Sequence, residues 1–281
     1  MAYMEVPVTQ EEIAEMEMRA KEIRIMTIEA IGHLGVGHIG GAMSVVDLLA
    51  LLYFRRMDID PSNPRRIDRD QFVLSKGHAG PALYSTLALK GYFPREWLST
   101  LNSGGTKLPS HCDRNKTPGV DMTTGSLGQG ISAACGIALG NRLAGIASRV
   151  YCVIGDGECD EGQVWEAAMF AAHYGLDTLT TFVDRNGMQI DGTTDQVMGL
   201  GSLYAKWEAF GWFVQEVNGH DMAAMDAAIE LAVASSGKPS MIILDTVKGK
   251  GFSLGEGQVA SHSMSFGPEE AQKAIAALEG R

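Results

Sequence analysis

Two short polar motifs, GDGE at residues 155–158 and DRNGM at residues 184–188, each follow directly on an apolar run. The Asp156 carboxylate, the Asn186 amide oxygen and one backbone carbonyl suit Mg²⁺ or Ca²⁺, with phosphate oxygens and water in the remaining positions, and they do not suit zinc. Each motif taken alone is equally typical of a tight turn. Their pairing at the ends of successive strands favours a site for a divalent cation and a diphosphate.

The apolar runs before these motifs predict strands, and helical patterns alternate with them along the chain. We expect strands at residues 71–74, 151–154, 179–183, 212–217 and 240–245, and helices at residues 81–89, 130–144, 164–174 and 222–234. The run at residues 149–154 does not alternate polar with apolar residues, as expected of a strand covered on both faces. The sequence therefore predicts an α/β fold: a doubly wound, mainly parallel sheet with helices on both faces. In such sheets ligands bind outside the carboxyl ends of the strands, where both motifs fall.

The amino-terminal part of the chain predicts a long helix followed by a glycine-rich loop. The helix begins at Thr9, where Glu12 completes a capping box, and ends near the glycines after Ile31. Residues 32–41 are too rich in glycine for a regular element, so we expect a loop that presents His38. An apolar helix at residues 44–54 follows.

Two further irregular segments carry histidines. Residues 75–78 form a turn after the first strand and end in His78, and residues 101–121 form a polar, proline-containing stretch that includes His111. The second segment is longer than most connections and is therefore predicted to be functional. Residues 249–267 are again irregular before a last helix at residues 268–278.

Composition excludes several classes of protein. The 281 residues carry a net charge of -11 and no basic run, which argues against nucleic acid as a partner. Residues 1–10 show neither a basic nor an apolar leader segment, and the apolar stretch at residues 45–54 is too short to span a membrane. We expect an unanchored cytoplasmic protein whose four cysteines are reduced, because they show no C-x-x-C spacing. No linker or repeat divides the chain, so residues 1–281 are expected to form one domain.

The GDG motif followed after about thirty residues by asparagine resembles the signature of thiamine diphosphate enzymes. The closer similarity is to the transketolase family. It covers nearly the whole chain through several motifs in the same order: GH at residues 37–38, FVLSKGH at residues 72–78, TTGSLGQG at residues 123–130, IDG at residues 190–192 and SH at residues 261–262.

The resemblance implies a role for individual residues. Those implied to hold the divalent cation, which is Mg²⁺ or in its place Ca²⁺ or Mn²⁺, are Asp156, Asn186 and the carbonyl of Met188. Those implied to bind thiamine diphosphate are His78, Gly125, Leu127, Gly157, Glu158, Asn186, Ile190 and His262, with Leu127 and Ile190 beside the rings of the cofactor. Those implied to surround the reacting carbonyl are His38, His78, His111 and His262.

A group of histidines suits sugar chemistry. A ketose carbonyl becomes an alkoxide when it is attacked, and imidazoles can both donate hydrogen bonds to it and move protons near neutral pH. A surface or structural role is the better interpretation of His33, His173 and His220. The three residues after His262 depart from the usual family pattern.

Two glutamates, Glu161 and Glu166, follow the first motif. They match acidic positions that link the two active sites of a dimer in the family, and they are equally typical of the first turn of a helix.

The resemblance also implies a partner, because family members bind the cofactor between two domains. Only the diphosphate-binding domain is present here, so we expect the pyrimidine-binding and C-terminal domains on another chain. The implied assembly is a heterotetramer of two copies of each chain. The implied reaction transfers a two-carbon ketol unit from a ketose to an aldose, with or without phosphate on the sugars.

Other functions remain open alternatives. A deoxyxylulose phosphate synthase and the α-subunit of a 2-oxo acid dehydrogenase share the cation motif, but the latter lacks this histidine set. The intact motifs argue against a regulatory homologue that has lost catalysis. A nicotinamide enzyme is disfavoured because no G-x-G-x-x-G opens a helix after an early strand.

Overall fold

The structure is a computed structural model that describes residues 8–280. The first seven residues, part of the stretch in which the sequence predicts no leader, lie outside the described residues. Within residues 8–280, no helix combines the length and the apolar character needed to span a membrane.

The first helix, α1 (Gln10–Leu34), confirms the predicted capping box. The Thr9 hydroxyl accepts a hydrogen bond from the backbone N–H of Glu12 (3.2 Å), and the Glu12 carboxylate accepts one from the backbone N–H of Thr9 (2.8 Å). The helix ends at Gly35, whose φ of 91° lies in the left-handed region that glycine adopts without strain.

The sheet has five parallel strands in the order β2-β3-β4-β8-β7. These strands are β2 (Gln71–Leu74), β3 (Val150–Gly155), β4 (Leu179–Arg185), β8 (Ser240–Asp245) and β7 (Phe213–Asn218). In the register of β3 with β4, Gly155 lies opposite Asp184, so the two polar motifs meet at the carboxyl edge of the sheet. The predicted parallel sheet is confirmed.

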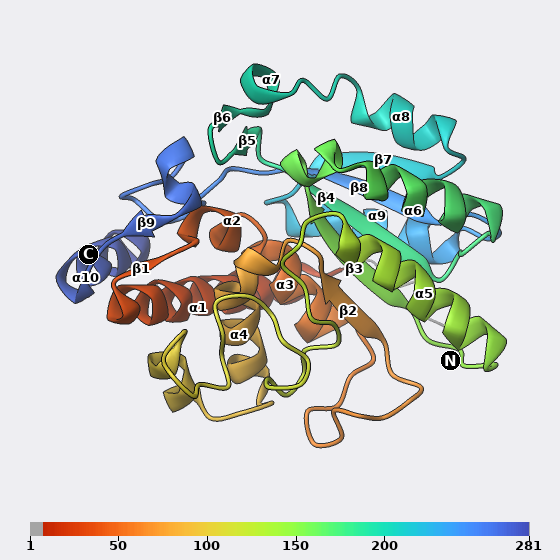
Figure 1. The fold of residues 1–281 in the computed structure, drawn as a ribbon. Helices are drawn as coiled ribbons and strands as arrows, with labels where there is room; N and C mark the ends of the chain where they lie inside the picture. The colour runs from red at the N-terminus through yellow and green to blue at the C-terminus, as the bar shows by residue number, and fades with distance from the viewer. Residues whose placement is uncertain (1–7, 281) are drawn as a thin grey trace.

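Helices cover both faces of the sheet (Figure 1). One face is covered by α1, α3 (Val46–Leu51), α4 (Gly80–Lys90) and α9 (Met222–Ala234), and the other by α5 (Gln129–Leu143), α6 (Gly162–His173) and α8 (Leu203–Ala209). Successive residues of β3 point to opposite faces. Tyr151 and Val153 join the first core, whereas Cys152 and Ile154 join the second. All four cysteines are buried and free.

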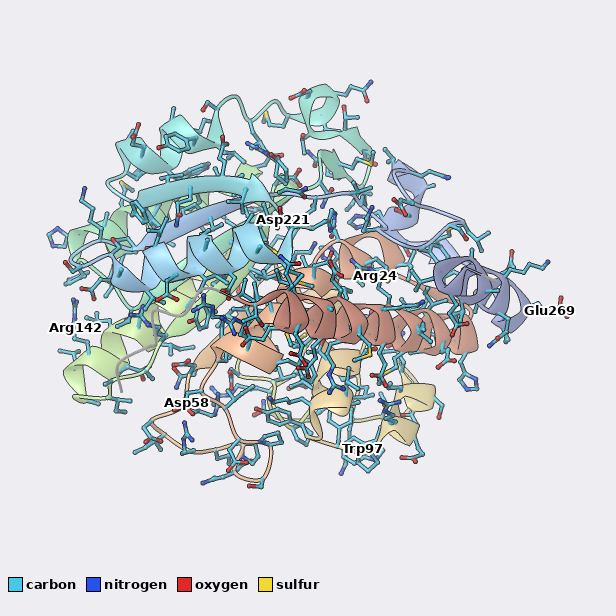
Figure 2. All side chains as sticks on the ribbon, turned by 180° about the vertical axis from the view of Figure 1, so that it is seen from behind. Arg24, Asp58, Trp97, Arg142, Asp221 and Glu269 are labelled. Atoms are coloured by element: carbon cyan, nitrogen blue, oxygen red, sulfur yellow. The ribbon has the colours of Figure 1, made fainter. Side chains whose placement is uncertain are left out.

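Short elements surround the carboxyl edge of the sheet. They are α2 (Ile39–Met43), the pair β1 (Val36–Gly37) and β9 (Met264–Ser265), the hairpin β5 (Met188–Gln189) and β6 (Gly192–Thr193), α7 (Thr194–Val197), and the 3-10 turns Gly77–Ala79, Gly157–Asp160 and Val259–His262. A further 3-10 turn, Arg95–Thr100, packs against α1 and α4. The last helix, α10 (Pro268–Glu279), packs against α1. Figure 2 shows the side chains from behind, with Arg24 labelled on α1 and Glu269 on α10.

The prediction of an irregular segment at residues 32–41 is wrong. There α1 continues to Leu34, β1 pairs with β9, and α2 begins at Ile39. The glycines allow close packing that local propensity does not reveal: a Cβ on Gly40 would stand 2.4 Å from the Ser261 hydroxyl oxygen. The predicted helix at residues 44–54 is α3 followed by a π-helical turn, Leu52–Arg56, and the predicted irregular tail contains β9.

Candidate active site

The loops after β3 and β4 form one unit. The two Asp156 carboxylate oxygens accept hydrogen bonds from the backbone N–H groups of Gly157 (2.8 Å) and Gly187 (2.6 Å). The Asn186 amide donates to Asp184 (2.9 Å), while its oxygen accepts from the Met188 N–H (3.2 Å). The three residues expected to hold a cation are therefore brought together.

Two buried lysines, which the sequence interpretation missed, stand beside this unit. The Lys76 ammonium pairs with the Asp184 carboxylate. The Lys248 ammonium donates to the Met188 carbonyl oxygen (3.2 Å) and lies 3.4 Å from Nδ1 of His262. The Met188 carbonyl thus already faces a positive charge.

The donor set fits a hard divalent cation. Burial, and then the nearby Asp184 carboxylate, raise the pKa of Asp156 to about 6, and a bound cation would favour its ionised form. Among residues 8–280 no three His, Cys, Asp or Glu side chains form a metal-binding group, so a cation here would need an amide, a carbonyl and phosphate oxygens beside Asp156.

Four imidazoles surround the same cavity. The ring centre of His38 lies 5.5 Å from that of His78, 5.6 Å from that of His111 and 5.5 Å from that of His262. The rings of His78 and His262 are 5.2 Å apart. The structure therefore brings together all four histidines that the sequence assigned to one site.

Burial favours the neutral form of these imidazoles. Burial lowers the pKa of His38, His78, His111 and His262, in the last case to about 4 with a further contribution from the Lys248 charge. A neutral imidazole has one donor and one acceptor nitrogen. The group can therefore donate hydrogen bonds to a developing alkoxide and also accept a proton.

The cavity has a volume of about 230 Å³. Its lining includes every predicted cation-binding, cofactor-binding and histidine position: His38, His78, His111, Gly125, Leu127, Asp156, Gly157, Glu158, Asn186, Met188, Ile190 and His262. A larger hollow of about 840 Å³ lies elsewhere, but two of its arginines, Arg66 and Arg69, are already paired with Asp58 and Asp121.

Two glycines give the cavity its shape. A Cβ on Gly41 would stand 2.9 Å from Nε2 of His78, and one on Gly125 would stand 3.2 Å from the ring of His111. Gly125 also has a φ of 152°, which other residues rarely adopt. Side chains at either position would displace the histidines.

Glu158 faces the loops rather than the cavity centre. Its carboxylate accepts hydrogen bonds from the Ser75 hydroxyl and from the backbone N–H groups of Gly128 (2.8 Å) and Gly155 (3.0 Å). Burial raises its pKa. The side chain fixes the first motif against the TTGSLGQG loop, and its predicted contact with the cofactor stays a prediction.

The remaining predicted residues lie outside the cavity. Glu161 is the N-cap residue of α6 and Glu166 lies within that helix, both exposed. His33 and His173 are exposed as well. His220 is a structural histidine, because Nδ1 lies 2.6 Å from Asp47 and Nε2 accepts a hydrogen bond from the Val247 N–H.

The parallel sheet and the family model that it matches define a thiamine diphosphate binding domain. Residues 16–279 match the family model described as transketolase, thiamine diphosphate binding domain. The chain belongs to the transketolase family and is an amino-terminal transketolase subunit, part of an enzyme that transfers ketol units.

Relatives of the same length are themselves transketolase subunits. The chain is 55% identical to the 6-deoxy-6-sulfo-D-fructose transketolase subunit of Clostridium sp. strain MSTE9, over 96% of this chain and 98% of the relative. It is 39% identical to one of the apulose-4-phosphate transketolase subunits, that of Actinobacillus succinogenes, over 94% and 96%.

The fold matches a solved transketolase from Leishmania mexicana with a TM-score of 0.90 at 33% identity. The match covers 95% of this chain but 41% of the Leishmania chain. The similarity to transketolase subunits favours ketol transfer over the alternative activities.

Proposed function

We propose that this chain forms the diphosphate-binding half of a split transketolase and acts with a separate chain that carries the pyrimidine-binding and C-terminal domains. Residues 1–281 are then one diphosphate-binding domain. The observation that supports this most directly is the cavity, in which four neutral imidazoles adjoin the Asp156, Asn186 and Met188 unit.

In this proposal the cation and the diphosphate bind at the carboxyl edge of the sheet. Asp156, Asn186 and the Met188 carbonyl would hold Mg²⁺, or Ca²⁺ or Mn²⁺, and the ammonium groups of Lys76 and Lys248 would offset the charge of the diphosphate. Both lysines line the same cavity. Thiamine diphosphate, once bound, supplies the carbon nucleophile that a ketose needs in order to lose its two-carbon unit.

We assign the four histidines to the sugar, and His78 and His262 also keep their predicted contact with the cofactor. The ring centre of His38 lies within 5.6 Å of each of the other three, so His38 is placed at the centre of the group to meet the substrate carbonyl. The rings of His111 and His262 are each within 5.6 Å of the His38 ring, centre to centre. Neutral imidazoles in these positions stabilise the negative charge that develops on the sugar oxygens and relay protons between them.

For the substrate, we propose a ketose with an anionic group at its far end, and 6-deoxy-6-sulfo-D-fructose as the donor. The relative at 55% identity carries that sugar in its name. The relative at 39% identity is named for a sugar phosphate, which makes phosphorylated sugars the alternative. The anionic group is expected to contact the partner subunit.

Two exposed apolar surfaces support an assembly. The first lies on α5 and α6 and includes Leu143 (80% exposed) and Met169 (55% exposed), and α6 also carries Glu161 and Glu166. We assign this surface to a second copy of the chain, so that the two glutamates link two active sites. Large apolar side chains exposed on two helices in contact with each other favour an interaction surface.

The second surface lies at the hairpin β5–β6 and at α7. It includes Ile190 (66% exposed), Val197 and Met198 (61% exposed), and Ile190 also lines the cavity. We assign it to the pyrimidine-binding subunit, which would close the cavity and complete a heterotetramer. A cytoplasmic location is part of the same proposal.

Reconstitution tests this function. The purified chain is mixed with the candidate partner subunit, Mg²⁺ and thiamine diphosphate, and ketol transfer is assayed with 6-deoxy-6-sulfo-D-fructose and with fructose 6-phosphate as donors. We expect turnover by the mixture, with the sulfonated sugar preferred, and none by either chain alone. Turnover by this chain alone would contradict the half-site proposal, and a preference for the phosphate would contradict the proposed donor.

A further inference from the structure

The segment after β8 that carries Lys248 is held from outside the cavity. The backbone N–H of Val247 donates to Nε2 of His220 (2.9 Å), and the backbone carbonyl of Lys250 accepts from Nε of Arg24 (3.0 Å). Lys248 lies between these two fixed points. Its ammonium reaches in the other direction, to the Met188 carbonyl.

Both fixed points are joined through one buried carboxylate. Arg24 donates to the two oxygens of Asp47 at 2.9 and 2.6 Å, and Nδ1 of His220 lies 2.6 Å from the same carboxylate. Residues 24, 47 and 220 come from α1, α3 and the loop between β7 and α9. Figure 2 labels Arg24 on α1 and Asp221, the neighbour of His220, where α9 begins.

The contacts of His220 determine its tautomer. Because Nε2 accepts a hydrogen bond from the Val247 N–H, the ring proton must be on Nδ1, which then donates to Asp47. Asp47 therefore orients the imidazole and keeps Nε2 available as an acceptor. This is the relation by which a carboxylate orients a histidine in many functional sites.

A gain in folding stability alone is a weak explanation for the buried network of Arg24, Asp47 and His220. A buried ion pair contributes little more to stability than apolar side chains of the same size, and such pairs are better explained where they define one geometry. Here the network fixes the geometry of one short segment, the backbone of residues 247–250. Arg24 and Asp47 are 7% exposed each, so the network is shielded from water, whereas Val247 is 36% exposed.

We propose that Arg24, Asp47 and His220 form a positioning network that fixes the backbone of residues 247–250 and thereby holds the Lys248 ammonium at the wall of the cavity beside Met188, where it can meet the diphosphate. The inference rests on the proposed role of the cavity as the diphosphate site. The three residues line no part of the cavity themselves. Their effect on the site is transmitted through the Val247 and Lys250 backbone.

The first test measures hydrogen–deuterium exchange at the Val247 amide in the full chain without cofactor. His220→Phe removes the acceptor and keeps an aromatic ring, whereas His220→Gln can place an amide oxygen near the position of Nε2. We expect about tenfold faster exchange in His220→Phe and recovery in His220→Gln, since one hydrogen bond protects this partly exposed amide. Wild-type exchange in His220→Phe would overturn the inference.

The second test measures the affinity of the same variants for inorganic diphosphate with Mg²⁺ by calorimetry, with Asp47→Asn included. We expect affinity to fall about tenfold in Asp47→Asn and His220→Phe, because Lys248 is no longer held. The matched control is Asp226→Asn, which weakens the buried ion pair of Asp226 on α9 with Arg56 in the helical turn after α3, a pair that includes none of Arg24, Asp47 and His220. It should lower thermal stability without changing diphosphate affinity.

The outcomes separate this inference from the proposed function. Unchanged diphosphate affinity in Asp47→Asn and His220→Phe, or an equal loss in Asp226→Asn, would overturn the positioning role while leaving the diphosphate site intact. A wild-type chain that binds no magnesium diphosphate would overturn the proposed function and this inference with it. The exchange measurement would then still report whether His220 holds Val247.

Discussion

The two sides of the cavity differ in how their polar groups are satisfied. On the sheet edge, the Asp184 carboxylate accepts hydrogen bonds from Lys76, Ser44, Thr246 and Asn186. On the other side, the imidazoles of His38, His78 and His111 have ring contacts but no hydrogen-bond partner within residues 8–280.

This difference separates binding from turnover. A network of satisfied, buried charges is rigid and suits a ligand of fixed charge such as a diphosphate with its cation. Imidazoles whose nitrogens are not engaged by the protein are free to bond with a substrate that changes charge during the reaction. Variants on the sheet edge should therefore lower the affinity for the cofactor, whereas variants of the histidines should lower kcat.

The largest effect is expected on the sheet edge. Asp156→Ala removes the one carboxylate in the proposed cation set, so the Mg²⁺-dependent affinity for thiamine diphosphate should fall by about a hundredfold or more. Titration of the reconstituted complex with cofactor, monitored by calorimetry, measures this. Asp60→Ala, at a turn far along the chain from Asp156 where the Asp60 carboxylate accepts hydrogen bonds from Ser62, is the control. An unchanged affinity in Asp156→Ala would refute the cation assignment.

A comparable loss of turnover is expected on the histidine side. His111→Asn removes a donor and proton carrier from the group, and kcat for ketol transfer should fall by about a hundredfold. The affinity for thiamine diphosphate should remain close to that of the unaltered complex. His33→Asn, which changes an exposed histidine of α1, should alter neither quantity. A weaker cofactor affinity with normal kcat would show that His111 serves cofactor binding and not turnover, and would contradict this prediction.

The contribution of the buried charges on the sheet edge can be measured as a change in the free energy of unfolding. Lys76→Met leaves the buried Asp184 carboxylate without its cation and should lower the free energy of unfolding by about 3 kcal/mol. The double variant Lys76→Met with Asp184→Asn should recover part of the loss, because no charge is then left unpaired. Arg95→Met, at an exposed pair with Glu22, should cost less than about 1 kcal/mol in denaturant unfolding.

A smaller, pH-dependent effect is expected from Asp47. Burial would raise the pKa of this carboxyl, but hydrogen bonds from His220 and Arg24 outweigh burial and lower it. A lowered folded-state pKa stabilises the protein above the unfolded-state value of about 4, and this contribution is lost as pH falls through the folded-state value. The stability difference between the unaltered chain and Asp47→Asn should thus be largest at pH 6–7 and shrink below about pH 4. A constant difference across this range would argue against the lowered pKa.

Much of the fold was predictable because local and tertiary preferences agree. The capping box at Thr9 and the apolar run of β3 require no knowledge of neighbours. Residues 32–41 were mispredicted because their glycines serve close packing of α2 rather than a loop. The helix α8 was also missed, since its short pattern around Trp207 gives a weak signal before it packs against the sheet.

The candidate site was predictable where a motif marks a strand end, and less so where a side chain is buried against expectation. Lys76 and Lys248 were overlooked because lysine is seldom buried unless paired. The position of Lys76 directly before Gly77 and His78, in the turn after the first strand, was the available signal. Nothing in the sequence indicates that Asp47 and His220 meet across the fold.

One measurement tests the division of the cavity most directly: the dissociation constant of thiamine diphosphate and the kcat of ketol transfer, determined together for His38→Ala in the reconstituted complex. His38 is the imidazole that contacts the other three. We predict that kcat falls by about a hundredfold or more while the dissociation constant changes less than about threefold. A dissociation constant raised in proportion, with kcat unchanged, would contradict the assignment of the histidines to the sugar.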